Sequence, residues 1–118
     1  MSSERDYVGY GANPPVFAWP GGARLAINLV VNYEEGSEYA YSNGDDRQES
    51  LGEWGVKVFP DGVRNLANES FFEYGSRVGF WRILALLERH AVPATFGVCA
   101  VALQKNPEAA RAIVAAGH

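Results

Sequence analysis

The fold is decided by the stretch Ala23-Arg-Leu-Ala-Ile-Asn-Leu-Val-Val-Asn-Tyr33, which Glu34-Glu35-Gly36 follows directly. The stretch is short and mostly apolar, and it contains the β-branched residues Ile27, Val30 and Val31, so it predicts a strand. An almost continuous apolar run is typical of a strand that is buried on both faces, as in a parallel sheet. The acidic pair and the glycine end this strand abruptly.

The sequence downstream predicts two helices and a second strand. Residues 76–91 carry apolar side chains at three- and four-residue spacing, which predicts a helix, and residues 94–100 read as another buried strand. Asn106-Pro107-Glu108 is typical of a helix start, with Gly117 as the C-cap. Residues 37–75 show little periodicity beyond a short strand or turn near 56–59, and so long a segment is more often functional than accidental. The order of elements indicates βα units with parallel strands, and therefore an α/β fold.

Composition narrows the classes of function. The chain has 118 residues, 47% of them hydrophobic, and a formal net charge of −4, which fits one soluble domain and argues against binding to nucleic acid or an anionic membrane. The lone Cys99 excludes an internal disulfide. Residues 1–22 are polar and rich in Gly and Pro, so we expect an extended arm and no secretory signal. We expect a cytoplasmic protein.

The acidic pair is the most suggestive chemical feature. Functional groups of α/β folds gather at the carboxyl ends of strands, which is where Glu34 and Glu35 lie in the sequence. Two neighbouring carboxylates repel each other, and this repulsion can give them different roles, one as a base and the other as a ligand. Gly36 permits a tight turn that would aim both acids inward. The alternative is an ordinary acidic turn at the surface, which spacing alone favours.

Other candidates each have a structural alternative. Arg77 would suit a clamp for a carboxylate, ureido or carbonyl group, or it is a solvated arginine on a helix. Ser76 is more typical of an N-cap than of a substrate contact. His90 suits a partner of a helix dipole, and Cys99 a small core residue. Five aromatic residues either line a pocket or anchor the long loop: Trp19, Trp54, Phe71, Phe72 and Tyr74.

Four motifs, in this order, resemble the polysaccharide-deacetylase (NodB-homology) superfamily. Asn32-Tyr-Glu-Glu-Gly36 resembles its first motif, usually Thr-Phe-Asp-Asp-Gly, and successive segments resemble Tyr74-Gly-Ser-Arg77, Ala94-Thr-Phe-Gly-Val98 and Gly117-His118. The likeness is greatest to the branch of allantoinases and related peptidoglycan deacetylases. It implies that residues 23–118 are the N-terminal part of a partial (β/α) barrel with parallel strands, preceded by the arm.

The resemblance also implies roles for individual residues. Glu34 takes the position of the general base, and Glu35 that of a ligand for a divalent, zinc-like metal if one is used. Tyr74, Ser76 and Arg77 take substrate-binding positions. Glu replaces Asp at both acidic positions, which fits a branch in which the metal is dispensable. The family's His-x-x-x-His segment is absent from this sequence, and His118 matches a histidine that is not a ligand.

Two hypotheses follow. In the first, the protein is a hydrolase of non-peptide C–N bonds that acts on a small cyclic amide, as in purine catabolism, or on an N-acetyl sugar, as in carbohydrate metabolism. In the second, the chain is a truncated, catalytically incomplete module. Two βα units leave an unpaired sheet edge and exposed apolar faces, so this chain would associate with itself or with a complementary chain.

Overall fold

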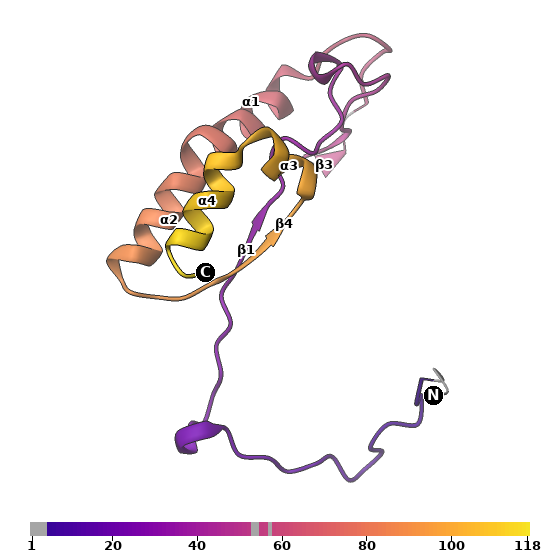
Figure 1. Ribbon diagram of the computed structural model, residues 1–118. Helices are drawn as coiled ribbons and strands as arrows, with labels where there is room; N and C mark the ends of the chain where they lie inside the picture. The colour runs from indigo at the N-terminus through magenta and orange to yellow at the C-terminus, as the bar shows by residue number, and fades with distance from the viewer. Residues whose placement is uncertain (1–4, 53–54, 57) are drawn as a thin grey trace.

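A parallel pair of strands forms the centre of the structure. The computed structural model describes residues 5–52, 55–56 and 58–118 (Figure 1). Strand β1 (Val30–Tyr33) pairs in parallel with β4 (Thr95–Val98), in a register that runs from Val30–Thr95 to Tyr33–Val98. The predicted βα order with parallel strands is therefore confirmed. A separate antiparallel pair joins β2 (Leu51–Gly52) to β3 (Gly55–Val56), and single 3₁₀ turns occupy Pro20–Gly22 and Tyr41–Asn43.

One long helical rod connects the two parallel strands. It consists of α1 (Leu66–Tyr74), a π-helical segment (Gly75–Gly79) and α2 (Phe80–Arg89). The predicted helix start at residue 76 is wrong, because Gly75 has right-handed helical angles (φ −56°, ψ −53°) and continues the rod. The predicted N-cap role of Ser76 is also wrong, since its hydroxyl donates to the carbonyl of Glu73 (3.2 Å) inside the helix. The cap is Asn65, whose side chain accepts from the Asn68 amide.

Residues 90–118 form helices and a strand close to those that the sequence predicts. His90 is the C-cap of α2, so it lies at a helix C-terminus, the position that its predicted role as a partner of the helix dipole requires. Strand β4 is shorter than residues 94–100 because Ala100 already begins α3 (Ala100–Lys105). Asn106 caps α4 (Pro107–Ala115) by accepting from the Ala109 amide at 3.3 Å, and Gly117 follows the helix with φ +77°. The predicted helix start is confirmed, whereas the C-cap is Ala116 and the predicted Gly117 lies one residue beyond it.

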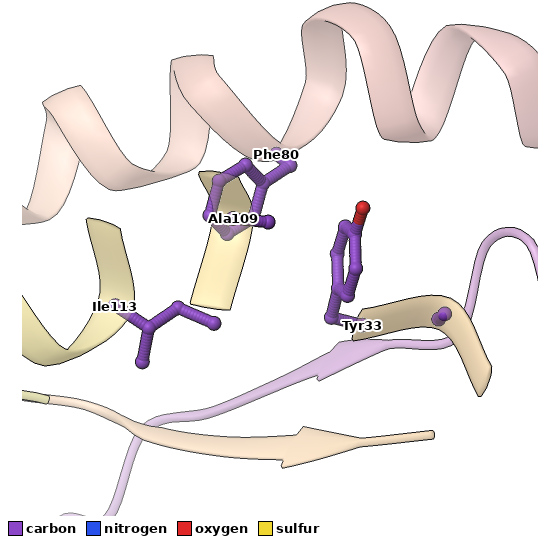
Figure 2. Close-up of a cluster of buried hydrophobic side chains, with 5 residues drawn as sticks. Tyr33, Phe80, Ala109 and Ile113 are labelled. Carbon is purple, nitrogen blue, oxygen red and sulfur yellow. The ribbon is translucent and has the colours of Figure 1, made fainter. Parts of the chain in front are cut away.

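The hydrophobic core lies between the strands and the helices. Figure 2 shows Tyr33 from β1, Phe80 from α2, and Ala109 and Ile113 from α4 converging on one cluster, which Ala102 completes. The rings of Tyr33 and Phe80 meet edge to face at 5.0 Å, a favourable geometry for aromatic pairs. This packing fixes the end of β1, and with it the acidic pair that follows Tyr33.

Strand β1 is shorter and more exposed than the sequence predicts. Residues 23–29 lie outside β1, and the side chains of Leu25 and Ile27 are 70% and 77% exposed. The prediction of burial on both faces is wrong for this chain, because Val30 and Asn32 are exposed, while Tyr33 packs into the core.

The N-terminal arm leads away from the helices and strands (Figure 1). With it, the chain has a radius of gyration of 19.9 Å, against about 13.5 Å for a compact domain of this length. None of the helices in the described part is both long and apolar enough to cross a membrane.

Candidate functional site

A cleft of about 870 Å³ opens where β1 ends. Its walls come from the loop after β1, from the β2–β3 hairpin and from the end of α1. Carboxylates line one part of it, namely Glu34, Glu35, Glu38 and Glu49. Aromatic rings line another, namely Tyr39, Phe71, Phe72 and Tyr74. Such a combination of an apolar wall with a few converging polar groups is typical of a small-molecule site.

The two predicted acids differ in how firmly they are held. Glu35 is half-buried, and its Oε2 accepts a hydrogen bond from the backbone amide of Glu34 at 3.2 Å. Its side chain lies directly on Gly75, where an added Cβ would come within 2.4 Å of Oε1. Glu34 is exposed, and its carbonyl accepts from the amide of Ser37 at 2.9 Å. The acidic pair therefore presents one anchored and one accessible carboxylate.

Gly36 makes this arrangement possible. Its φ of +105° lies in the range that side chains disfavour. The backbone also passes close to α3 here, because a Cβ on Gly36 would lie 3.7 Å from the Cα of Ala102. The tight turn predicted after the acidic pair is confirmed.

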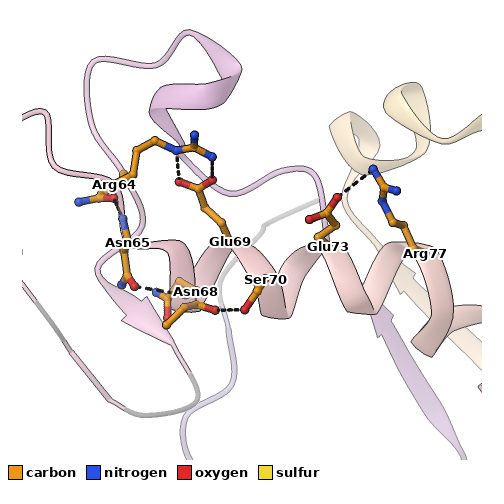
Figure 3. Close-up of polar contacts among 9 residues, drawn as sticks. Arg64, Asn65, Asn68, Glu69, Ser70, Glu73 and Arg77 are labelled. Atoms are coloured by element: carbon orange, nitrogen blue, oxygen red, sulfur yellow. Dashed lines mark hydrogen bonds and ion pairs between the residues drawn. The ribbon is translucent and has the colours of Figure 1, made fainter.

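The structure separates the three predicted substrate-binding residues. Tyr74 lines the cleft, and its hydroxyl accepts from Nη1 of Arg82 at 3.0 Å. Ser76 borders a smaller neighbouring cleft of about 300 Å³. Arg77 is 74% exposed, is not among the cleft's lining residues, and pairs with Glu73 at 2.8 Å (Figure 3). The cleft thus brings Tyr74 to the acidic pair and leaves Ser76 and Arg77 outside.

The other residues singled out in the sequence are the aromatic side chains, Cys99 and His118. Phe71 and Phe72 line the cleft with Tyr74, whereas Trp19 lies on the arm with its ring 5.1 Å from that of Phe17. Trp54 lies outside the described residues. Cys99 packs against the core cluster, in line with the structural interpretation. The Nδ1 atom of His118 accepts from the Ala94 amide at 3.2 Å.

Several residues of the cleft were missed by sequence reasoning. Glu38 and Glu49 lie in the aperiodic segment and carry no motif. Asn68 is buried, and its Nδ2 donates to the carbonyls of Glu49 (3.4 Å) and Leu51 (3.5 Å), which fastens the β2 hairpin to α1. Asn65, whose capping bond to Asn68 Figure 3 shows, was the signal in the sequence that could have revealed α1.

The charge of the cleft limits what it can bind. Among the described residues that line it, four are carboxylates and none is Lys or Arg, so an anionic substrate is disfavoured. The described part of the chain holds no group of three or more His, Cys, Asp or Glu side chains placed to bind a metal. These residues therefore do not form a complete metal site.

Known proteins match this chain over nearly all of its length, while no family model matches. A Schizosaccharomyces pombe protein named "Putative polysaccharide deacetylase" is 42% identical over 99% of this chain and 38% of its own length. The crystal structure of a "probable Polysaccharide deacetylase" from Pseudomonas aeruginosa PAO1 is 49% identical, with a TM-score of 0.82 over 97% of this chain and 38% of that one. Puue Allantoinase is 45% identical, with a TM-score of 0.82 over 100% of this chain and 39% of that one. The chain is thus similar to these three proteins over nearly all of its own length, and it spans less than half of theirs.

Proposed function

We propose that the protein contributes the acidic pair of a hydrolase that cleaves non-peptide C–N bonds. The observation that carries this proposal is that Glu34 and Glu35 follow a core strand and line one cleft with an aromatic wall. The names of the relatives support two substrate classes, a cyclic amide such as allantoin and an N-acetylated sugar. Both substrates are uncharged at the bond that breaks, which suits a cleft whose described lining residues include no Lys or Arg.

The geometry suggests different roles for the two acids. Glu34 is exposed at the cleft and is the better placed to take a proton from an attacking water. Glu35 is half-buried, lies in the space that Gly75 leaves free and accepts from the Glu34 amide, so it suits an electrostatic or ligand role. Because the described residues do not complete a metal site, no step is assigned to a metal. If a metal is used, Glu35 is its ligand from this chain.

Tyr74 is the substrate contact that the geometry supports. Its ring forms part of the aromatic wall, and its hydroxyl, which accepts from Arg82, keeps a proton to donate to a substrate oxygen. Ser76 and Arg77 remain predictions from the resemblance alone.

We also propose that residues 23–118 form the first part of a (β/α) barrel, with residues 1–22 as an arm. The parallel β1–β4 pair with its connecting helices, and the TM-scores of 0.82, support this. The exposed apolar side chains of the arm and strands favour a homo-oligomer or a complementary chain as partner. The lone free Cys99 is the support for a reducing, cytoplasmic location.

A chimaera tests the activity. This chain would replace the N-terminal portion of Puue Allantoinase, and turnover of allantoin and of N-acetylglucosamine oligomers would be measured with and without a chelator, beside the chain alone. We expect the chimaera to hydrolyse one of the two substrate classes. Complete loss on chelation would exclude a metal-free reaction, and a folded chimaera inactive on both substrates would contradict the proposal.

A further inference from the structure

Both ends of the acidic pair are attached to the same junction between two helices. Tyr33 immediately precedes the pair, and its hydroxyl accepts from Nδ2 of Asn106 at 2.9 Å. Gly36 immediately follows the pair, and its carbonyl accepts from Nζ of Lys105. Lys105 ends α3 and Asn106 precedes α4, so two consecutive residues hold the two sides of Glu34 and Glu35.

The Asn106 side chain has only one orientation that satisfies its neighbours. Its Oδ1 accepts from the Ala109 amide and caps α4, while its backbone amide donates to the Ala102 carbonyl at 3.0 Å. Because the amide oxygen is engaged by the cap, the amide nitrogen faces Tyr33. The Tyr33 side chain is 1% exposed and packs on Phe80. Water therefore does not compete for the bond between Tyr33 and Asn106, and a buried polar group that loses its partner is costly.

The Lys105 contact is the more replaceable half of this attachment. Lys105 is exposed, and its ammonium is a flexible donor. Gly36 is also held by its approach to α3, independently of that bond. The bond between Asn106 and Tyr33 is therefore the one that mainly sets the position of the acidic pair.

We propose that Asn106 is a positioning residue for the acidic pair, acting through Tyr33; this rests on the proposed hydrolase function. The two acids span the chain between the two attachments, so a shift of the helix junction moves both carboxylates in the cleft. Reacting groups tolerate displacements of only about 0.5 Å, and a misplacement of ~1 Å costs roughly 100-fold in rate. Asn106 thereby couples the start of α4 to the site.

Three substitutions separate positioning from helix capping. Asn106→Ser keeps a capping oxygen but is too short to reach Tyr33. Tyr33→Phe removes only the hydroxyl. Asn106→Asp keeps the cap and offers an acceptor to the Tyr33 hydroxyl, which can donate as well as accept. In the chimaera, we expect Asn106→Ser and Tyr33→Phe to lower kcat about 10- to 100-fold with KM changed less than about threefold, and Asn106→Asp to restore most of kcat.

The control is a core substitution, and the second measurement is hydrogen exchange. Ile113→Val loses one methyl group from the same helix and core and should leave kcat unchanged. In this chain, hydrogen exchange of the Ser37 amide, which is bonded to the Glu34 carbonyl, would be compared with that of Thr95. Faster exchange at Ser37 in Asn106→Ser and Tyr33→Phe, but not in Ile113→Val, is expected even if the chimaera proves inactive and the hydrolase function fails. Unchanged exchange, or equal kcat losses in Ile113→Val, would overturn the positioning role.

Discussion

The side chain of Glu35 lies against Gly75. A Cβ on this glycine would come 2.4 Å from Oε1 and 2.7 Å from Cγ of the glutamate. Gly75 begins the π-helical segment in the middle of the long rod. Such segments often occur at functional sites. The contact joins the end of β1 to the helix and sets where one of the two acids stands in the cleft.

Gly75→Ala should displace this acid without unfolding the helix. Alanine favours a helix by up to about 1 kcal/mol over glycine, which offsets the local crowding. The Glu35 side chain has to move away, so we expect turnover of the chimaera to fall roughly 10- to 100-fold. Gly79→Ala is the matched control in the same segment, because its Cβ would meet ordinary contacts at 3.6 Å. Equal turnover in the two variants would show that the Glu35 position does not matter.

Glu34→Gln and Glu35→Gln test the acids themselves. Removal of a general base typically costs about 100- to 10,000-fold in rate, so we expect the larger loss at Glu34 and a smaller one at Glu35. Glu108→Gln is the control, since Glu108 is exposed and pairs with Arg111 on α4 outside the cleft. The measurement is kcat/KM of the chimaera on allantoin and on N-acetylglucosamine oligomers. Near-normal kcat/KM in both variants would remove the pair from the mechanism.

The sequence predicted correctly those helix starts that depend on residues a few positions apart. Asn106-Pro107-Glu108 indicated the start of α4 correctly, because capping depends on residues three positions apart. The helix was predicted to begin only at residue 76, whereas it continues through Gly75, which lies against Glu35, 40 positions away in sequence and adjacent only in the fold.

The same distinction holds for the site. The acidic pair was visible because it follows an apolar strand, and the resemblance gave its roles. Asn106 touches Tyr33 across 73 positions, and Glu38 and Glu49 enter the cleft from a segment without periodicity. Long-range contacts of this kind are set by tertiary packing, which a single sequence does not display.

Asn65→Ala should destabilise the chain through the start of α1. The side chain of Asn65 caps the helix by accepting from the Asn68 amide at 3.2 Å, and loss of an Asn cap costs about 1 kcal/mol. We expect thermal unfolding followed by circular dichroism to shift down by about 4 °C. Asn13→Ala, in the exposed arm, should shift it by less than about 2 °C. An unchanged midpoint for Asn65→Ala would mean that α1 does not depend on its cap.

Acid should weaken one specific ion pair near this cap. The guanidinium of Arg64, chiefly by hydrogen bonding, holds the pKa of the Glu69 carboxyl below its ordinary value of 4.5. The folded state therefore binds its proton less readily than the unfolded state. The stabilisation is fully present above about pH 4.5 and is lost as the pH falls through the lower pKa of the folded state. The pair is partly exposed, so the effect is small and should shrink in salt.

Glu69→Gln reveals this contribution. We expect the difference in urea midpoint between the unsubstituted chain and Glu69→Gln to be largest near neutral pH and to vanish at low pH. Glu108→Gln, in another exposed pair, lacks the bidentate geometry of Arg64 and Glu69 and should show a smaller difference. A difference for Glu69→Gln that stays constant from about pH 6 to pH 3 would contradict the assigned pKa direction.

The chain by itself should associate in solution. It exposes 9422 Å², against about 6,300 Å² for a compact monomer of its mass, and Leu25 and Ile27 are among its most exposed apolar side chains. Burial of such side chains is worth about 25 cal/mol per Å², which favours contact with a second copy. Light scattering, which reports mass independently of shape, should give more than the 12.9 kDa of one chain. Leu25→Asp with Ile27→Asp should return the mass toward one chain, whereas Ser42→Asp with Ser50→Asp adds the same charge at exposed polar positions and should not. A monomeric mass with a cooperative thermal transition would show that the exposed residues 23–29 and the arm do not drive association.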